Sequence, residues 1–531
     1  MAGPIVALAL LPINERGVQI TQGALAIAAT ALLLWRREAK DRSGAPRRLP
    51  DALLALFGVV GLAAWSGFGH FHFDDYIHDW DAYHYYIGAK YLPELQYTRL
   101  YDCTAVAEQE LALADPPSGS RLIRNLTTNE LVPASTALSE PQRCRSRFSA
   151  VRWEAFRADI GFFKQRTRPD RWEQIQQDHG FNGTPVWAIA GYLLTNLGPA
   201  TFAQLLALTS LDLVLLAVIW ICLVWGFGWR AACVCAVAFG TSHAARFGWN
   251  GGSLLRFDWL CALVCGLVCL KRGRSFWAGF LLCTSALLRV FPAFALAAVV
   301  LLGVQRAFAQ PRGEMRQNAL RLLRPLLAGA ALAAALGAGL SVAIPGRGSL
   351  ALWSGFVGNS RKHLATPLNN NLGLQALVYF QTPEMISKAD RPPGSITQEN
   401  KLWRARRALV ASARWPLYFV LLAAGLALLA GAARREEAWV VAILGIGFVP
   451  LVADLTCYYF VFQLCLGLLW VRRPAVGIAL CAQCALQSIA GLLLPEGFLL
   501  GAVLSAAVVL LWAFAAAAVA LDSAPPCPEV G

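Results

Sequence analysis

Long uninterrupted stretches of apolar residues recur along the chain, and they constrain its fold more than any other feature. The stretch 202–224 contains one acidic residue and 498–520 contains none. About 20 apolar residues in a helix span the hydrocarbon core of a bilayer, and these stretches do not alternate as barrel strands do. With 57% hydrophobic and 15% charged residues, the chain is not an ordinary soluble protein. The pattern predicts an all-α polytopic membrane protein.

The apolar stretches divide into thirteen predicted transmembrane helices, several of them short for a full crossing. They are 18–35, 53–71, 202–224, 231–245, 257–270, 276–288, 291–304, 325–343, 410–432, 438–455, 457–471, 475–494 and 498–520. The apolar segment 185–197 is bounded by Pro185 and Pro199. We interpret it as a re-entrant or interfacial helix.

Basic residues concentrate in the short loops 36–50, 271–274, 305–324, 434–435 and 472–473. With thirteen spans and the N-terminus outside, all five loops fall on the cytoplasmic side, as the positive-inside rule requires. This arrangement predicts a multi-pass protein of the cell (inner) membrane with a cytoplasmic C-terminus. It also accounts for the net charge of +14 without a nucleic-acid partner. No basic region precedes the first apolar stretch, 5–11, so we expect no signal peptide.

The same topology makes 1–521 one transmembrane domain with two long extracytoplasmic loops, 72–201 and 344–409. Sixteen of the 32 acidic residues lie between positions 72 and 184, so we expect a folded subdomain in the first loop. Loops of this length are usually functional. The tail 522–531 is expected to be disordered.

Only two of the fourteen cysteines, Cys103 and Cys144, lie in the predicted outer polar loop. The extracytoplasmic compartment is oxidising, so we predict a disulfide bond between them. The others lie in or beside apolar stretches or in the tail, where small apolar side chains pack.

Four histidines and four aspartates occur within residues 70–84, where the chain leaves the second predicted helix on the outer side. From Trp80 to Leu92 the pattern suits an interfacial helix, with Asp81, His84, Tyr85 and Gly88 on one face and Gly88 leaving room for a ligand or another helix. Three interpretations remain open: an aromatic belt with an acidic rim, a metal site, or a carboxylate general base. We favour the base, and we expect no metal because no two histidines have ligand spacing on one helix.

The residues Asp81, Tyr85, Tyr86 and Ala89, followed by Leu100-Tyr101-Asp102, resemble a pattern of the GT-C superfamily. These membrane glycosyltransferases use polyprenyl-phosphate-linked sugars, and the nearest branch resembles the bacterial polyprenol-phosphate-mannose-type α-mannosyltransferases. The resemblance implies that Asp81 is the catalytic base, with Asp79 as the second candidate. Here Ala82 follows Asp81, whereas an aromatic residue, Trp80, follows Asp79 as in the family. The choice between the two aspartates therefore stays open.

A lipid-phosphate donor would need cations at the outer ends of helices. The candidate substrate-binding residues are His78, His84, Tyr85, Arg246, Arg256, Arg289, Arg361, His363, Asn370, Asp454 and Tyr458. Arg289 could instead be a snorkelling arginine, and the group from Arg361 to Asn370 would equally suit anionic lipid headgroups. Asp212 lies in the middle of a span and suits a structural hydrogen bond.

These features together with the resemblance predict a membrane glycosyltransferase that needs no cofactor, and the resemblance implies mannose as the sugar. It would move a sugar from a polyprenyl-phosphate donor to an extracytoplasmic glycan or glycolipid acceptor. The alternative is a transporter or flippase for a lipid-linked sugar or another anionic substrate, with Asp212, Asp258 and Asp454 as pathway charges. A third class is a non-catalytic envelope scaffold. The nucleotide-binding, serine-hydrolase and zinc-hydrolase motifs that we sought do not occur.

Overall fold

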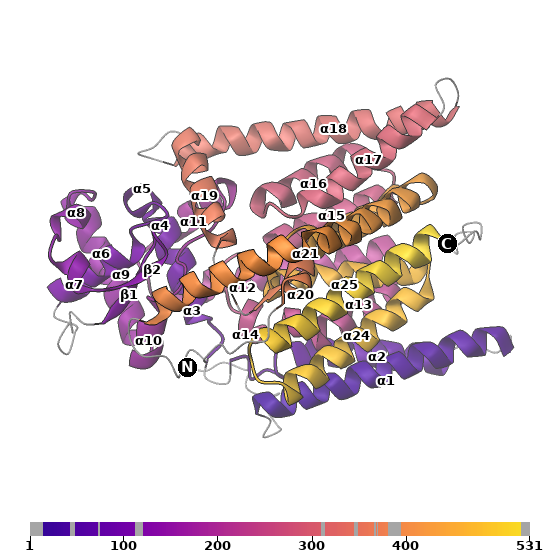
Figure 1. Ribbon diagram of the computed structural model, residues 1–531, viewed down its shortest axis with the longest axis horizontal. Coiled ribbons are helices and arrows are strands. Elements are labelled where there is room, and N and C mark those ends of the chain that lie inside the picture. The colour runs from indigo at the N-terminus through magenta and orange to yellow at the C-terminus, as the bar shows by residue number, and fades with distance from the viewer. Residues whose placement is uncertain are drawn as a thin grey trace.

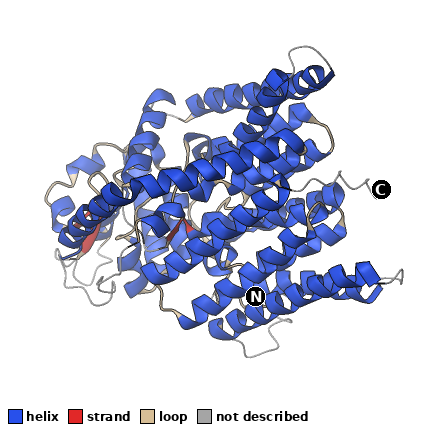
Figure 2. Ribbon diagram, turned by 45° about the vertical axis from the view of Figure 1, so that its right-hand side comes forward, coloured by secondary structure: helices blue, strands red, loops and turns tan. Residues whose placement is uncertain are grey.

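The computed structural model describes residues 14–42, 48–72, 75–111, 121–309, 314–344, 349–365, 368, 370–380 and 395–521. The N-terminal stretch 5–11 and the tail 522–531, both subjects of sequence-based predictions, lie outside the described residues. The described chain is almost entirely helical, with two short antiparallel strand pairs (Figure 2). The prediction of an all-α protein is confirmed.

Seven helices are long and apolar enough to cross a membrane. They are α1 (Glu15–Arg42), α2 (Arg48–Trp65), α12 (Phe202–Phe227), α18 (Glu314–Leu340), α21 (Ser395–Arg435), α24 (Pro474–Leu493) and α25 (Phe498–Ala520). Many of their large apolar side chains are exposed: Ile221 on α12 has 68% of its surface accessible. Such exposure is costly in water and favourable in lipid, so these helices belong to a membrane-embedded protein.

The other six predicted spans also form helices, but these helices are shorter. They are α13 (Trp229–Thr241), α15 (Asp258–Lys271), α16 (Ser275–Leu288), α17 (Ala293–Ala309), the pair α22 (Ala438–Gly447) and α23 (Val449–Val452), and the 3₁₀ helix η6 (Cys457–Val471). The predicted segment 185–197 is the helix α11 (Pro185–Thr195).

Two helix boundaries differ from the prediction for identifiable reasons. The helix predicted for 53–71 ends at Trp65, because Gly67 and Gly69 adopt positive φ angles of 61° and 89° and close a turn. The second predicted outer loop, 344–409, is not a loop throughout. It contains α19 (Ser349–Leu364) and α20 (Leu374–Val378), and α21 already begins at Ser395.

The first predicted outer loop folds as a compact subdomain at one end of the helical bundle (Figure 1). Its elements are α3 (Asp79–Ala82), the π-helix η2 (Tyr83–Ile87), α4 (Gly88–Lys90), α5 (Leu92–Leu95), α6 (Leu100–Glu110), the strands β1 (Leu122–Asn125) and β2 (Glu130–Pro133), α7 (Ser135–Leu138), α8 (Gln142–Arg145), α9 (Ala150–Arg166) and α10 (Pro169–Ile175). The predicted disulfide is present and joins Cys103 of α6 to Cys144 of α8.

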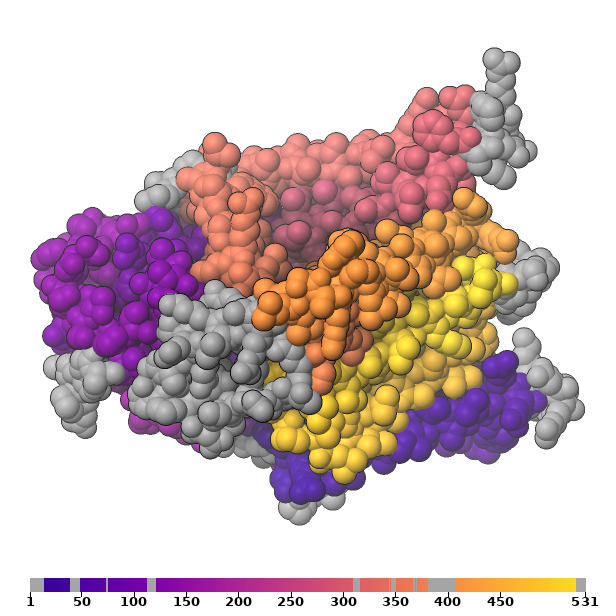
Figure 3. Space-filling model, in the orientation of Figure 1, coloured from indigo at the N-terminus to yellow at the C-terminus, as the bar shows by residue number. Residues whose placement is uncertain are grey.

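The subdomain has its own core, which explains why so polar a segment is folded. Tyr83, Tyr86 and Tyr101 are fully buried together with Phe156 and Phe163 of α9. In the space-filling view this subdomain forms one end of the molecule and borders the surface of α19 (Figure 3).

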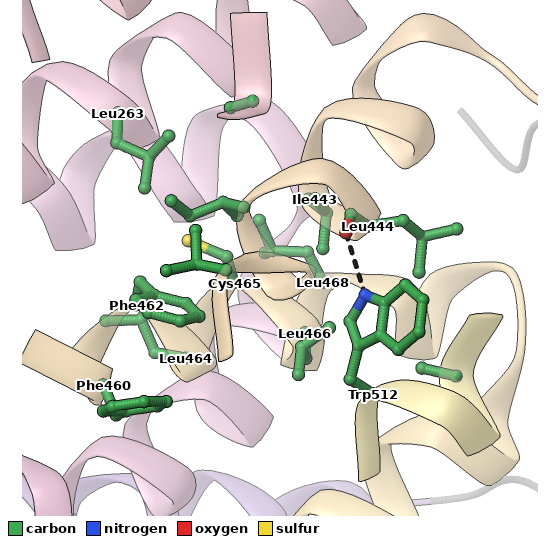
Figure 4. Close-up of a cluster of buried hydrophobic side chains, with 14 of the residues drawn as sticks. Leu263, Ile443, Leu444, Phe460, Phe462, Leu464, Cys465, Leu466, Leu468 and Trp512 are labelled. Carbon is green, nitrogen blue, oxygen red and sulfur yellow. Dashed lines mark hydrogen bonds between the residues drawn. The ribbon is translucent and has the colours of Figure 1, made fainter. Parts of the chain in front are cut away.

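The main core includes the short helices α22 and η6 together with one face of the long helix α25. Ile443 and Leu444 of α22 pack with Leu464, Leu466 and Leu468 of η6 (Figure 4). Trp512 of α25 donates from its indole nitrogen to the Leu444 carbonyl oxygen at 2.9 Å. Strands β3 (Asn371–Leu372) and β4 (Leu455–Thr456) then bring the start of η6 beside the second outer segment.

Candidate functional site

Asp81 lies in the first turn of α3, and this α-helix continues directly into the π-helix η2. The His78 side chain caps this helix, and its Nδ1 atom accepts the Asp81 backbone N–H at 3.2 Å. Because Nδ1 accepts, the neutral ring carries its hydrogen on Nε2, which donates to the Gly248 carbonyl at 3.0 Å. Burial holds the pKa of His78 below its ordinary value, so His78 acts as a neutral positioning group.

The π-helical turn after Asp81 separates side chains that a regular α-helix would place on one face. His84 bonds to Tyr101 at 2.6 Å, in the core of the subdomain, whereas Tyr85 points to Asn182. A Cβ on Gly88 would lie 2.5 Å from Phe181. The prediction that Gly88 leaves room for a ligand is therefore wrong, because the Phe181 ring fills that space.

A glycine-rich loop at 248–252 holds the Asp81 segment against the bundle. The Gly252 carbonyl accepts the His78 N–H at 2.9 Å. A Cβ on Gly252 would lie only 1.9 Å from the Tyr76 carbonyl oxygen, and Gly252 has a φ of 65°. Only glycine permits both this conformation and this approach. The same loop leads directly into Arg256.

Arg256 is the cation that faces Asp81. Its Nη1 atom lies 3.2 Å from Asp81 Oδ2, with only 5% and 15% of the two side chains exposed. The guanidinium also lies 4.2 Å from the centre of the Tyr458 ring. Asp212 of α12 fixes the backbone here by accepting the N–H groups of Arg256 and Phe257 at 2.9 and 3.1 Å. The structural hydrogen bond predicted for Asp212 is therefore present.

The charges around Asp81 favour its ionised form. Burial by itself would raise the pKa of Asp81, but the charge of Arg256 holds that pKa below its ordinary value. The buried Ser253 hydroxyl adjoins the Asp81 carboxylate and also favours its ionised form.

Arg289, at the turn after α16, is a second buried cation of this group. Its guanidinium carbon lies 5.9 Å from the Tyr85 ring centre and 5.7 Å from that of Trp187. Nη1 donates to the Leu288 carbonyl at 2.9 Å, whereas Nε is buried and bonds to none of the described residues. The acidic group that acts on it most is Asp258. Arg289 therefore lies among aromatic rings, which is inconsistent with a snorkelling arginine.

Five of the predicted substrate-binding residues lie around Asp81: His78, Tyr85, Arg256, Arg289 and Tyr458. Six others lie elsewhere. Arg246 approaches Gly491 of α24, and Arg361 is exposed on α19. His363 lies beside His179, and His84 faces Tyr101 and Asp178. Asn370 contributes its carbonyl to Cys457, and Asp454 pairs with Arg407 at 2.9 Å.

The second candidate base, Asp79, points away from this group. Its Oδ1 atom lies 2.6 Å from Arg166 Nε, and Arg166 also pairs with Asp75. Asp79 is thus part of an ion-pair network between the start of α3 and the end of α9. Asp81, by contrast, pairs with the buried Arg256.

The sequence pattern missed several residues of the site. Ser253 and Tyr459 adjoin the Asp81 group, as does Asp258, which the sequence suggested only as a pathway charge of a transporter. Asn182 and Asp178 belong to the segment Asp178-His-Gly-Phe-Asn-Gly, which contacts both Tyr85 and His84. Polar side chains between glycines in an outer loop were the available signal, since such residues often serve a site.

An ionised carboxylate beside two buried arginines can do two kinds of chemistry. The carboxylate can accept a proton from a bound hydroxyl. The arginines can hold a phosphate, because guanidinium groups match its geometry and charge. Comparisons with models of protein families, with curated proteins and with solved structures found no match for this chain. Its function is therefore inferred from the site itself.

Proposed function

We propose that this protein is a membrane glycosyltransferase that moves a sugar from a polyprenyl-phosphate donor to an extracytoplasmic acceptor. In this proposal all thirteen helical segments cross the membrane, and the Asp81 subdomain lies outside. The observation that carries the proposal is the approach of Arg256 to buried Asp81, with Arg289 beside the neighbouring Tyr85. Three segments distant in sequence supply one carboxylate and two cations, which are the groups that the proposed reaction needs.

The proposed reaction needs one proton acceptor and one anion site. Asp81 takes the proton of the acceptor hydroxyl as that oxygen attacks the anomeric carbon of the sugar. The bond from that carbon to the donor phosphate breaks, and the lipid phosphate leaves with the bonding electrons. Arg256 and Arg289 stabilise the charge that develops on it. A phosphate bound to Arg256 would also raise the basicity of Asp81, because its negative charge opposes that of Arg256.

The contacts of Asp212, Asp258 and Asp454, the three predicted pathway charges, count against the transporter alternative. Asp212 accepts two backbone N–H groups, and Asp454 binds Arg407 and the Ala376 N–H. Asp258 accepts the Trp259 N–H at 2.6 Å. A pathway charge must exchange partners as its substrate passes, and these carboxylates already have local structural partners.

The proposal is tested by the variant Asp81→Asn, which keeps the size of the side chain and removes its basicity. We expect loss of sugar transfer at unchanged membrane expression and an unchanged elution profile. The first assay is mass spectrometry of envelope glycolipids. A deletion strain should lack one saccharide, and expression of Asp81→Asn in that strain should not restore it. The second is transfer from a labelled polyprenyl-phosphate sugar by the purified chain.

Asp79→Asn is the matched comparison, since it removes a carboxylate two residues away that pairs with Arg166 instead. We expect transfer to persist in this variant. Full activity of Asp81→Asn would exclude its carboxylate from the mechanism. Loss of activity in Asp79→Asn alone would assign the base to Asp79.

A further inference from the structure

A second polar cluster lies where α19 meets the first outer subdomain, outside the Asp81 group. Asn359 and His363 are one turn apart on α19 and so share a face. Asn359 Nδ2 donates to the Phe181 carbonyl at 3.3 Å, and the His363 ring lies 5.5 Å from the His179 ring. We call Asn359, Lys362 and His363, with Arg124 of β1 and His179, the α19 site.

Two side-chain atoms of the α19 site are buried and lack a hydrogen bond to any residue that the structure describes. They are Asn359 Oδ1 and His363 Nε2. Asn359 is only 5% exposed. Leaving such an atom unpaired is unfavourable, so a folded protein rarely retains two of them on one face without a ligand or water to pair them.

Two cations adjoin these atoms. Arg124 donates to the carbonyl oxygens of Gln177 and Asn129 at 2.7 and 2.8 Å, and Lys362 donates to that of Leu126. Asp178, whose Oδ2 atom accepts the Trp80 indole N–H, is the acidic group that acts on Arg124. The charged groups that the structure describes here are therefore the two cations and this carboxylate.

The two cations also act on the pKa of His363. Burial, followed by Lys362 and then Arg124, lowers the pKa of its ring to about 4, against the opposing effect of Asp178. The ring is therefore neutral at physiological pH, so one of its nitrogens can donate a hydrogen bond. The Asn359 oxygen can only accept one.

These groups define the chemistry of a ligand. The Asn359 oxygen can only accept a hydrogen bond, so it suits a hydroxyl group. The two cations and the hydrogen-bond donor of the His363 ring suit an anion. We propose that the α19 site binds a sugar or polyol that carries a phosphate or a carboxylate. Such a group could belong to an acidic lipid headgroup or to a soluble glycan. This site would bind its ligand whether or not Asp81 acts as a base.

Binding by the purified full chain tests the proposal for both sources. For a soluble ligand, glucose 1-phosphate and glucuronate are titrated against the chain in phosphatidylcholine nanodiscs, with glucose as the neutral comparison. For a lipid ligand, native mass spectrometry measures retention of phosphatidylinositol over phosphatidylcholine. We expect a charged probe to bind in at least one arm, and the responding arm identifies the source.

Three variants separate binding from folding. Lys362→Gln and His363→Leu are expected to weaken binding of the charged probe about tenfold. Arg168→Gln removes the same charge from an arginine that is 74% exposed in the same subdomain and should leave binding unchanged. His363→Leu should melt no lower than the native chain, because it removes an unpaired buried atom.

The proposal is overturned if no charged probe binds better than its neutral comparison in either arm. It is also overturned if Arg168→Gln weakens binding as much as Lys362→Gln does. A large loss of thermal stability in His363→Leu would assign that ring a structural role instead.

Discussion

The geometry of the site makes Gly252→Ala its most informative perturbation. The added Cβ would lie 1.9 Å from the Tyr76 carbonyl oxygen, whereas a carbon and an oxygen approach to about 3.3 Å. The loop and the segment 76–78 must therefore separate by about 1.4 Å. His78, which caps the helix of Asp81, would move with that segment away from Arg256.

Two costs add up in this variant. An alanine at a φ of 65° costs about 1 kcal/mol in a left-handed conformation. Loss of the hydrogen bond from the His78 N–H to the Gly252 carbonyl costs about 1 kcal/mol more. We expect the free energy of unfolding to fall by about 2 kcal/mol. Because displacement by about 1 Å can cost a hundredfold in rate, we expect sugar transfer to fall on the order of a hundredfold.

Gly248→Ala is the matched control in the same loop. A Cβ there meets no atom within 4 Å, and Gly248 is not among the residues with positive φ. Thermal unfolding and transfer from a labelled donor are measured on both variants. If Gly252→Ala unfolds and transfers sugar like Gly248→Ala, the close approach of the two segments does not position Asp81, and the reasoning is refuted.

Three further predictions concern other charges and the disulfide. Cys103 and Cys144 are 41 residues apart, so replacing both by serine should destabilise the subdomain by about 4 kcal/mol; a reductant should then lower the melting temperature of the native chain but not of the variant. Arg256→Gln removes the cation that holds down the pKa of Asp81. Since the base acts when ionised, the acid limb of kcat/KM should move to higher pH, and an unmoved limb would contradict this role. Burial and a neighbouring arginine lower the pKa of Lys362 to about 8. Binding of a charged sugar at the α19 site should therefore weaken as the pH rises through about 8, and titration at pH 7 and pH 9 measures the difference.

Local sequence pattern predicted the parts of this protein that depend on residues close in the chain. The apolar stretches coincide with helices because a run of apolar residues in a membrane must satisfy its own backbone hydrogen bonds. The disulfide followed from composition, since Cys103 and Cys144 are the two cysteines of one polar segment. The clustering of acidic and aromatic residues around Asp81 likewise drew attention to the segment that approaches Arg256.

The partners of those residues were decided by the tertiary structure. Arg256 pairs with Asp81, and Arg289 lies beside Tyr85, although 175 and 204 positions separate the members of these two pairs in the sequence. Nothing in the local pattern distinguishes them from Arg246, which faces α24 instead. Pairings over such distances depend on how helices pack, and hydrophobic periodicity specifies only which face is buried.

The sequence by itself thus determined that the chain is a helical membrane protein with a folded, disulfide-linked polar segment after its second apolar helix. It did not determine the π-helical turn that directs His84 and Tyr85 to different neighbours, nor the choice between Asp79 and Asp81 as the carboxylate facing the buried arginines. Helix formation and apolar burial depend on the chemistry of neighbouring residues. The ionisation and contacts of a buried carboxylate depend on charges that only the folded chain brings within a few ångströms.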